Sequence, residues 1–172
     1  MAIDDTALAA LLDEAVIARL IARYASMTDW LDWEAIRPLF TADAHFDFGA
    51  MCRGGLEAYL PFVQPMEAGY DRRMHMMGLP RVELAGDEAR AEAPSLIHAR
   101  NHASDGSDHH ADLLFYGRYM FTARREGGTW KLASLRYYLS ALYPLAAEVM
   151  DESALNTATG FAPSHADAMR HG

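Results

Sequence analysis

The sequence predicts a single α+β domain, and two observations carry that prediction. Apolar residues recur with a helical period over the first thirty residues, whereas from Met74 onward they alternate with a period of two, as strands do. Two turn signals, Gly86-Asp87 and Gly127-Gly128, separate strand-like stretches. Helices followed by an antiparallel meander indicate an α+β domain, whereas regular alternation of strands and helices would indicate a parallel sheet.

Three helices and one strand are expected before residue 70. The first helix has Asp4 or Asp5 as its N-terminal cap, and its apolar stripe consists of Leu8, Leu12, Val16, Leu20, Tyr24 and Met27. A second, short helix is expected over residues 34–40, and the alternating residues 44–48 predict the first strand. The third helix is expected over residues 56–63, because Gly54-Gly55 and Pro65 bracket it.

The remainder of the domain, which we expect to span residues 1–143, is predicted to be four strands. They cover about residues 74–84, 89–102, 111–125 and 129–140. Residues 144–172 form a tail with one short helical segment near 146–150 and too few periodic apolar positions to fold independently. The sequence leaves three roles open for this tail: a lid over a pocket, an oligomer contact or a disordered extension.

Composition argues against several classes of function. The 172 residues include 15 Lys plus Arg against 24 Asp plus Glu, a formal net charge of -9, so nucleic-acid binding is not expected. The single Cys52 excludes an intrachain disulfide and a multi-cysteine metal centre, and suits the cytoplasm. No apolar run is long enough for a membrane span. The many Met and aromatic residues suit an adaptable apolar cavity, a filled core or a subunit interface.

Asp29 and His75 are the strongest candidates for chemistry. At 100° per residue Asp29 lies about 80° around the helix from Ile21, so its carboxylate borders the buried stripe and needs a partner. His75 follows the charged run that ends at Arg73 and precedes two methionines, which places it between polar and apolar surroundings. A carboxylate that fixes the tautomer of an imidazole makes the histidine a competent general base. The purely structural alternatives are that Asp29 is a helix-end residue with local hydrogen bonds and that His75 is a half-buried strand residue.

A second group of histidines is weaker evidence for a site. It consists of His98, His102, His109 and His110, with Asp112 close by. A metal site is not expected, because no helical His-x-x-x-His spacing is present and a polar turn interrupts the group. His98 is instead expected to be a second hydrogen-bond donor in a pocket, with an outward-facing strand residue as the alternative.

Aromatic side chains on the last two strands are expected first as core packing and second as pocket walls. Tyr119 shares a strand face with Phe121, and Tyr137 shares one with Leu135 and Leu139. Their phenols could also donate hydrogen bonds to a ligand.

Short sequence motifs along almost the whole chain add to this prediction of fold and site. In order they are Arg23-Tyr24-Ala25 leading to Asp29, Asp32-Trp33, Leu39-Phe40-Thr41-Ala42-Asp43-Ala44, Arg73-Met74-His75, Gly86-Asp87-Glu88-Ala89, Gly117-Arg118-Tyr119 and Gly128-Thr129-Trp130-Lys131-Leu132. Their order and spacing over about residues 8–140 resemble the SnoaL-like branch of the nuclear transport factor two-like superfamily. The resemblance implies a cystatin-like, cone-shaped α+β barrel, in which about three N-terminal helices wrap a curved, mostly antiparallel sheet around an apolar pocket.

The resemblance also implies roles for particular residues. In dehydratase and dehydrochlorinase members an Asp at the end of the first helix and a His on this strand form a dyad, and they match Asp29 and His75 here. The fungal dehydratase pattern has tyrosines where this chain has Thr28 and Phe48, so scytalone is not expected as the substrate. The dehydrochlorinase pattern has a Lys in the helical turn that carries Tyr24 here.

These observations predict a cofactor-independent lyase or isomerase, similar to a dehydratase or cyclase, acting on a small hydrophobic molecule. His75 would abstract a proton and Asp29 would orient it, while the expected substrate-binding residues are Tyr24, Phe48, His98, Tyr119 and Tyr137. Two other functions stay open: a non-catalytic ligand-binding module, and a structural partner like the small subunit of a ring-hydroxylating dioxygenase. A homodimer or homotrimer through the sheet is expected, because the family associates in this way.

Overall fold

The computed structural model describes residues 4–101 and 111–146, which form three helices against one curved sheet. The helices are α1 (Asp5–Asp29), α2 (Trp33–Ile36) and α3 (Leu56–Ala68), and a short 3-10 turn (Arg37–Leu39) follows α2. The strands are β1 (Phe40–Asp47), β2 (Arg53–Gly54), β3 (Tyr70–Met77), β4 (Arg81–Ala85), β5 (Glu88–Asn101), β6 (Ala111–Glu126) and β7 (Thr129–Ala146). The predicted α+β class is confirmed.

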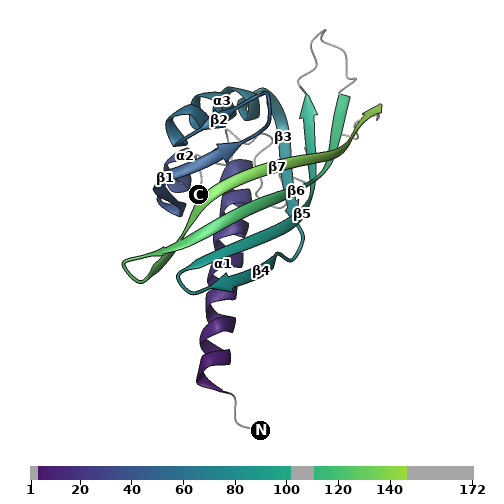
Figure 1. Cartoon of the computed structure of the whole chain (residues 1–172). Helices are drawn as coiled ribbons and strands as arrows, with labels where there is room; N and C mark the ends of the chain where they lie inside the picture. The colour runs from purple at the N-terminus through teal and green to yellow at the C-terminus, as the bar shows by residue number, and fades with distance from the viewer. Residues whose placement is uncertain (1–3, 102–110, 147–172) are drawn as a thin grey trace, which may run out of the picture.

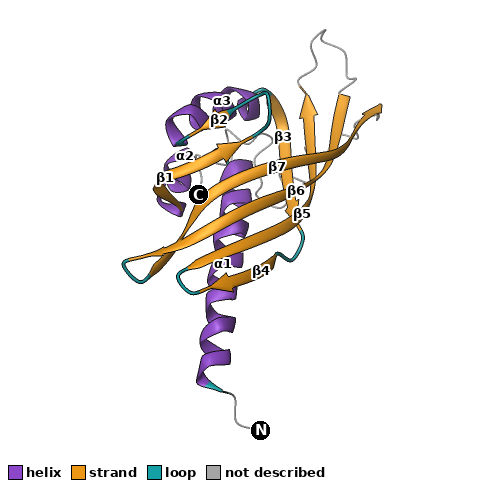
Figure 2. Cartoon of the chain, in the orientation of Figure 1, coloured by secondary structure: helices purple, strands orange, loops and turns teal. Residues whose placement is uncertain are grey.

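The sheet is mixed and does not close into a barrel. Its strand order is β2-β1-β7-β6-β5-β3, and β4 pairs with β5 beyond the end of β3. All pairings are antiparallel except that of β1 with β7. Helix α1 crosses the concave face of the sheet, and the N-terminal half of the helix extends beyond the sheet (Figure 1). Helices α2 and α3 lie together beside β1 and β2 at one end (Figure 2). Residues of α3 and of the sheet line a cavity between them.

The core forms where the apolar face of α1 meets the inward side chains of the sheet. Asp4 caps α1 by accepting a hydrogen bond from the backbone N–H of Thr6. The most buried apolar side chains include Ile17, Ile21, Ile36, Phe46, Leu132 and Leu135. Asp13 joins α1 to the β6–β7 hairpin, because its carboxylate accepts from Trp130 Nε1 at 2.8 Å and pairs with Arg125. The long helix is therefore fixed against the sheet by packing and by one polar anchor.

The predicted strand over residues 74–84 is two strands, β3 and β4. The break falls at Gly78, whose backbone N–H donates to the carbonyl oxygen of Pro94 at 2.8 Å. A Cβ at Gly78 would lie 2.7 Å from the Pro94 ring, so only glycine allows this close approach. Both strands pair with β5, β3 along its second half and β4 along its first half.

Three other predicted boundaries were wrong. The second helix ends at Ile36, and strand β1 begins at Phe40 instead of residue 44, because Pro38 tightens the chain into the 3-10 turn. Helix α3 continues through Pro65 to Ala68, although Pro61 and Pro65 both lack an N–H. Burial of its inward face offsets those lost hydrogen bonds, and the extra turn brings Glu67 onto the helix.

The tail lies almost wholly outside the described residues. Pro144 and Leu145 belong to β7, which ends at Ala146, and the helical segment expected near 146–150 falls in residues 147–172, which the structure does not describe.

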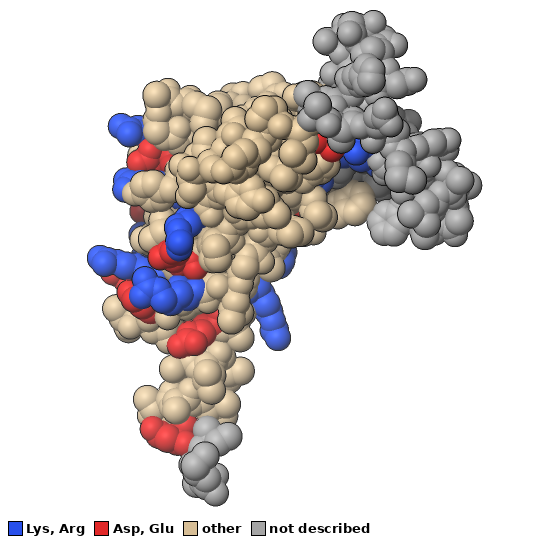
Figure 3. Space-filling view, turned by 90° about the vertical axis from the view of Figure 1, so that its right-hand side faces the viewer, with Lys and Arg blue, Asp and Glu red and all other residues tan. Residues whose placement is uncertain are grey.

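None of the helices in the described ranges is long and apolar enough to cross a membrane. Blue and red side chains lie next to each other in Figure 3, so the charged residues of that view form no extended basic area.

Candidate active site

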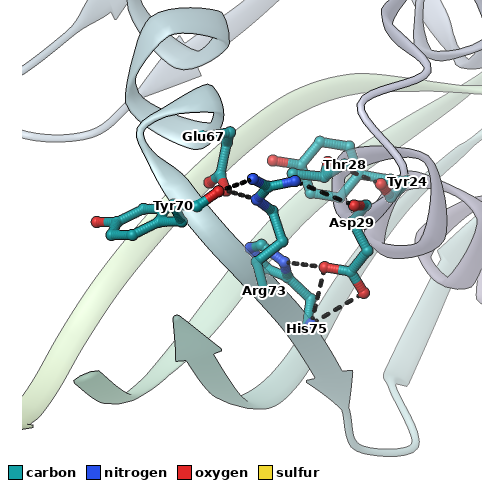
Figure 4. A network of polar contacts seen from close by, with 7 residues as sticks. All are labelled: Tyr24, Thr28, Asp29, Glu67, Tyr70, Arg73 and His75. Carbon is teal, nitrogen blue, oxygen red and sulfur yellow. Dashed lines mark hydrogen bonds and ion pairs between the residues drawn. The ribbon is translucent and has the colours of Figure 1, made fainter. Parts of the chain in front are cut away.

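The last residue of α1 and a residue of β3 form a close Asp-His pair. His75 Nδ1 lies 2.7 Å from Asp29 Oδ1, and the backbone N–H of His75 lies 3.0 Å from each carboxylate oxygen (Figure 4). His75 faces inward because β3 alternates, with Arg73 and His75 buried and Met74 and Met76 exposed. The contact between the two side chains has the geometry that the sequence predicts.

This contact determines which nitrogen of the neutral His75 imidazole carries the proton. A carboxylate accepts, so the neutral ring carries its proton on Nδ1 and leaves a lone pair on Nε2. In Figure 4 the second ring nitrogen points away from Asp29. The His75 side chain is only 3% exposed and lines a cavity, whereas Asp29 lies behind it and is not among the lining residues. Asp29 therefore orients the ring, and Nε2 can act on a molecule in the cavity.

The cavity has a volume of about 390 Å³ and a mostly apolar wall. It lies between α1, α3 and the inward face of β3, β5, β6 and β7. Of the sequence-predicted residues, Tyr24, Phe48, His75, Tyr119 and Tyr137 line it. The volume is within the usual range for sites that bind small organic molecules.

Three tyrosines supply protonated phenols to this apolar space. Tyr24 and Tyr59 hydroxyls lie 2.7 Å apart, so one donates to the other. Burial raises the pKa of Tyr24, Tyr59 and Tyr119 above the ordinary tyrosine value, so all three stay neutral at physiological pH. Among the described residues the Tyr119 hydroxyl has no hydrogen-bond partner in the structure. Tyr119 and the Tyr24–Tyr59 pair can therefore donate to an oxygen on which negative charge develops.

Tyr137 and Phe48 contribute ring faces. The two rings stack with centroids 6.3 Å apart, and Phe48 also stacks on Tyr59. The Tyr137 hydroxyl is buried against Gly117: a Cβ there would lie 2.5 Å from that oxygen and 2.6 Å from the carbonyl oxygen of Tyr138. Tyr137 thus presents its ring and not its hydroxyl to a ligand.

The prediction that His98 is a pocket donor was wrong. Strand β5 alternates without interruption, so Ile97 and Ala99 face inward and His98 faces the outer side of the sheet. There His98 Nε2 lies 2.8 Å from Asp112 Oδ2, and Arg100 Nε lies 3.0 Å from Asp112 Oδ1. Burial opposes ionisation of Asp112, but the bonds from Arg100 and His98 outweigh it and lower the Asp112 pKa.

In the part of the chain that the structure describes, no group of three or more His, Cys, Asp or Glu side chains is placed to hold a metal ion. The remaining histidines of the second group, His102, His109 and His110, lie outside the described residues.

Sequence reasoning missed a buried ion pair beside the dyad. Arg73 Nε lies 3.3 Å from Glu67 Oε2, with side chains 1% and 8% exposed. The guanidinium also donates to the backbone carbonyl oxygens of Asp29 at 3.3 Å and of Tyr70 at 2.7 Å. Arg73 therefore connects the end of α1 to the turn after α3 (Figure 4). One feature of the sequence could have revealed Glu67: it has the helical spacing of the inward-facing Leu60 and Val63. It lies beyond Pro65, however, where the helix was expected to end.

Comparison with solved structures gives relatives of the same fold. A protein assigned as a scytalone dehydratase from Novosphingobium aromaticivorans is 18% identical with a TM-score of 0.68, covering 81% of this chain and 91% of that chain. A hexachlorocyclohexane dehydrochlorinase from Novosphingobium barchaimii is 19% identical with a TM-score of 0.72, covering 81% and 94%. An NTF2-like protein with a cystatin-like fold from Novosphingobium aromaticivorans is 25% identical with a TM-score of 0.56, covering 80% and 90%.

The first two relatives are too distant in sequence to show more than the fold. Comparison with curated proteins gives no match. The sequence profile of the SnoaL-like domain matches residues 9–136, a range that runs from the first half of α1 into β7 and includes Asp29 and His75. The chain belongs to the SnoaL-like domain family.

Proposed function

We propose that the protein is a cofactor-independent lyase or isomerase that removes a carbon-bound proton from a small hydrophobic organic molecule. The observation that carries the proposal is the 2.7 Å contact of His75 Nδ1 with Asp29 at the wall of an apolar cavity. The dehydratase and dehydrochlorinase relatives support it as proteins of the same fold, because both names describe eliminations. The substrate would carry that bond next to a carbonyl group or a leaving group.

His75 Nε2 is the base in this reaction. Asp29 holds the tautomer that leaves Nε2 unprotonated, and its carboxylate stabilises the imidazolium that forms. Tyr119 and the Tyr24–Tyr59 pair donate to the substrate oxygen, because their phenols remain protonated. Apolar walls around these donors exclude water and strengthen their interaction with a developing anion.

Proton abstraction is testable without knowledge of the natural substrate. We expect wild-type protein in D₂O to accelerate the loss of α-proton NMR signals from members of a panel of aryl and cyclic ketones, and His75→Gln to lack this effect. His98→Gln is the matched control, because it removes an imidazole that pairs with a carboxylate on the outer face of the sheet. Ligand-induced thermal stabilisation without any exchange would instead identify a non-catalytic binding module, which the apolar cavity also fits.

We expect the protein to form a homodimer or homotrimer through the outer face of the sheet. The large apolar side chains exposed on this face include Met74, Met76, Tyr116, Tyr138 and Tyr143, each between 43% and 54% exposed. Light scattering should give a multiple of the 19.1 kDa chain mass, and Tyr116→Glu should lower that mass. Leu11→Glu is the control, because it also replaces an exposed apolar side chain by a carboxylate but lies on the projecting half of α1. It should leave the mass unaltered. A wild-type monomer at micromolar concentration would contradict the expectation.

A further inference from the structure

Glu67 carries the one carboxylate among the described residues that line the cavity. It stands on the last turn of α3, and its side chain is only 8% exposed. Apart from tyrosine hydroxyls and the imidazole of His75, the other lining side chains in the described ranges contain no oxygen or nitrogen. Glu and Asp side chains are almost never buried to this extent unless they are paired, so the contacts of this carboxylate indicate what it is for.

The charge of Glu67 is matched, but its hydrogen-bonding capacity is not. Arg73 Nε lies 3.3 Å from Oε2, although its N–H is not aligned for a hydrogen bond. The guanidinium donates instead to the backbone carbonyl oxygens of Asp29 and Tyr70 (Figure 4). In the part of the chain that the structure describes, no group donates a hydrogen bond to the Glu67 carboxylate. A carboxylate has about four acceptor positions, so Glu67 is an ionised acceptor with capacity to spare.

The phenols near Glu67 do not use this capacity. The Tyr70 hydroxyl points away from the Glu67 carboxylate in Figure 4, and the Tyr24 hydroxyl pairs with that of Tyr59 at 2.7 Å. Both Glu67 oxygens remain accessible, because neither is among the buried side-chain atoms that lack a hydrogen-bond partner. The space that they face is the cavity, since Glu67 belongs to its lining.

An acceptor of this kind selects among the molecules that enter the cavity. A buried carboxylate without hydrogen bonds is unfavourable, and water meets its need while the cavity is filled with solvent. A ligand that fills the cavity displaces this water. It must then donate a hydrogen bond to Glu67 itself, or it leaves a charged acceptor unsatisfied in an apolar wall.

We propose that Glu67 determines specificity by accepting a hydrogen bond from an O–H or N–H group of the substrate. The inference rests on the proposed function, in which this cavity is the substrate site, and deepens it by naming a group that the substrate carries. The substrate is a hydrophobic molecule with an acidic C–H for His75, an oxygen that accepts from the tyrosines, and a donor for Glu67. The donor group is recognised and takes no part in the chemical step.

A hydroxyl group and a protonated amine both supply such a donor. The ammonium group adds attraction to the carboxylate, which makes its hydrogen bond stronger. The hydroxyl group costs less to remove from water. The chemistry that the two share is donation to a buried anion, and a comparison of matched ligands separates them.

The test measures the binding of three probes that share a phenylethyl body, by isothermal titration calorimetry at neutral pH. They are 2-phenylethanol, protonated 2-phenylethylamine, and the methyl ether of 2-phenylethanol, which keeps the oxygen but cannot donate. We expect the wild type to bind the alcohol or the amine about 10-fold or more tightly than the ether, the effect of a hydrogen bond to a charged group. Glu67→Met should remove this preference. Glu57→Met, on the exposed side of α3, is the matched control and should retain it.

Each outcome bears on the role of Glu67. A preference for the alcohol over the amine identifies the donor as a hydroxyl, and the reverse order identifies it as an ammonium group. Equal binding of all three probes by the wild type, a donor preference that survives Glu67→Met, or no binding of any probe would overturn the inference. If Glu67→Met does not fold, Glu67→Asp allows the same comparison, because it keeps the charge for Arg73 and withdraws the carboxylate from the cavity by one methylene.

The same probes separate this inference from the proposed function. None of them carries a carbonyl group, so their binding does not depend on proton abstraction by His75. A donor preference in a protein that exchanges no α-proton of any ketone would overturn the proposed reaction and leave Glu67 as the recognition residue of a binding module. Exchange of ketone protons without a donor preference would overturn the role of Glu67 and leave that of His75 intact.

Discussion

Asp29→Asn is expected to reduce proton abstraction by about 10²–10⁴-fold, the range for loss of a carboxylate that holds the tautomer of a catalytic histidine. The amide can present its NH₂ group to Nδ1, which would move the ring proton to Nε2 and remove the lone pair that faces the cavity. It also carries no charge to stabilise the imidazolium. The measurement is the rate of α-proton exchange in D₂O, with circular dichroism to confirm folding.

The structure offers a matched control for this substitution. Asp112 makes a similar contact with His98, at 2.8 Å, on the outer face of the sheet. Asp112→Asn should therefore leave the exchange rate within a few-fold of the wild type, whatever it costs in stability. If Asp29→Asn and Asp112→Asn have the same exchange rate, the Asp29–His75 contact is structural and the base lies elsewhere.

Arg73→Met is expected to lower the free energy of unfolding by about 3–5 kcal/mol, because removal of one partner of a buried ion pair leaves the charge of the other partner buried and unpaired. The substitution leaves Glu67 without its cation, and the carbonyl oxygens of Asp29 and Tyr70 without their donor. Urea unfolding measures the loss. Arg118→Met is the control, since Arg118 pairs with Glu92 on the exposed surface, where such pairs contribute about 1 kcal/mol or less.

A double substitution separates the pair from other effects of Arg73. Glu67→Gln removes the charge that Arg73→Met leaves unpaired, so the double variant should lose less stability than the sum of the two single variants. Strictly additive losses would show that Arg73 acts only through the two carbonyl oxygens.

The parts of the fold that local sequence determines could be predicted. The stripe that contains Leu20 and Tyr24 predicts α1, and the glycine turns at Gly86 and Gly127 predict the hairpins of the meander, because period and turn chemistry are local properties. The parallel pairing of β1 with β7 joins residues such as Phe46 and Leu135, and no local signal specifies a contact over that separation.

The candidate site was predictable to a similar extent. Asp29 and His75 could be paired because one ends a helix and the other stands within a recognisable sequence word. His98 could not be assigned to a face of β5, since Pro94 left the phase of the strand open until the register was known. Glu67 was hidden for a different reason: the packing that carries α3 past Pro65 is tertiary, and a proline in an isolated sequence predicts the end of a helix.

Gly117 gives the protein a way to alter which molecules it accepts without a change in any residue that the molecule touches. The Tyr137 ring occupies the space that a side chain at position 117 would fill. Any larger residue there must push the Tyr137 ring toward the cavity or displace the neighbouring strand. The width of the cavity therefore depends on the residue at position 117, which does not itself line the cavity. Homologues that share the dyad but differ at this position can therefore diverge in substrate size while the chemistry of proton removal stays the same.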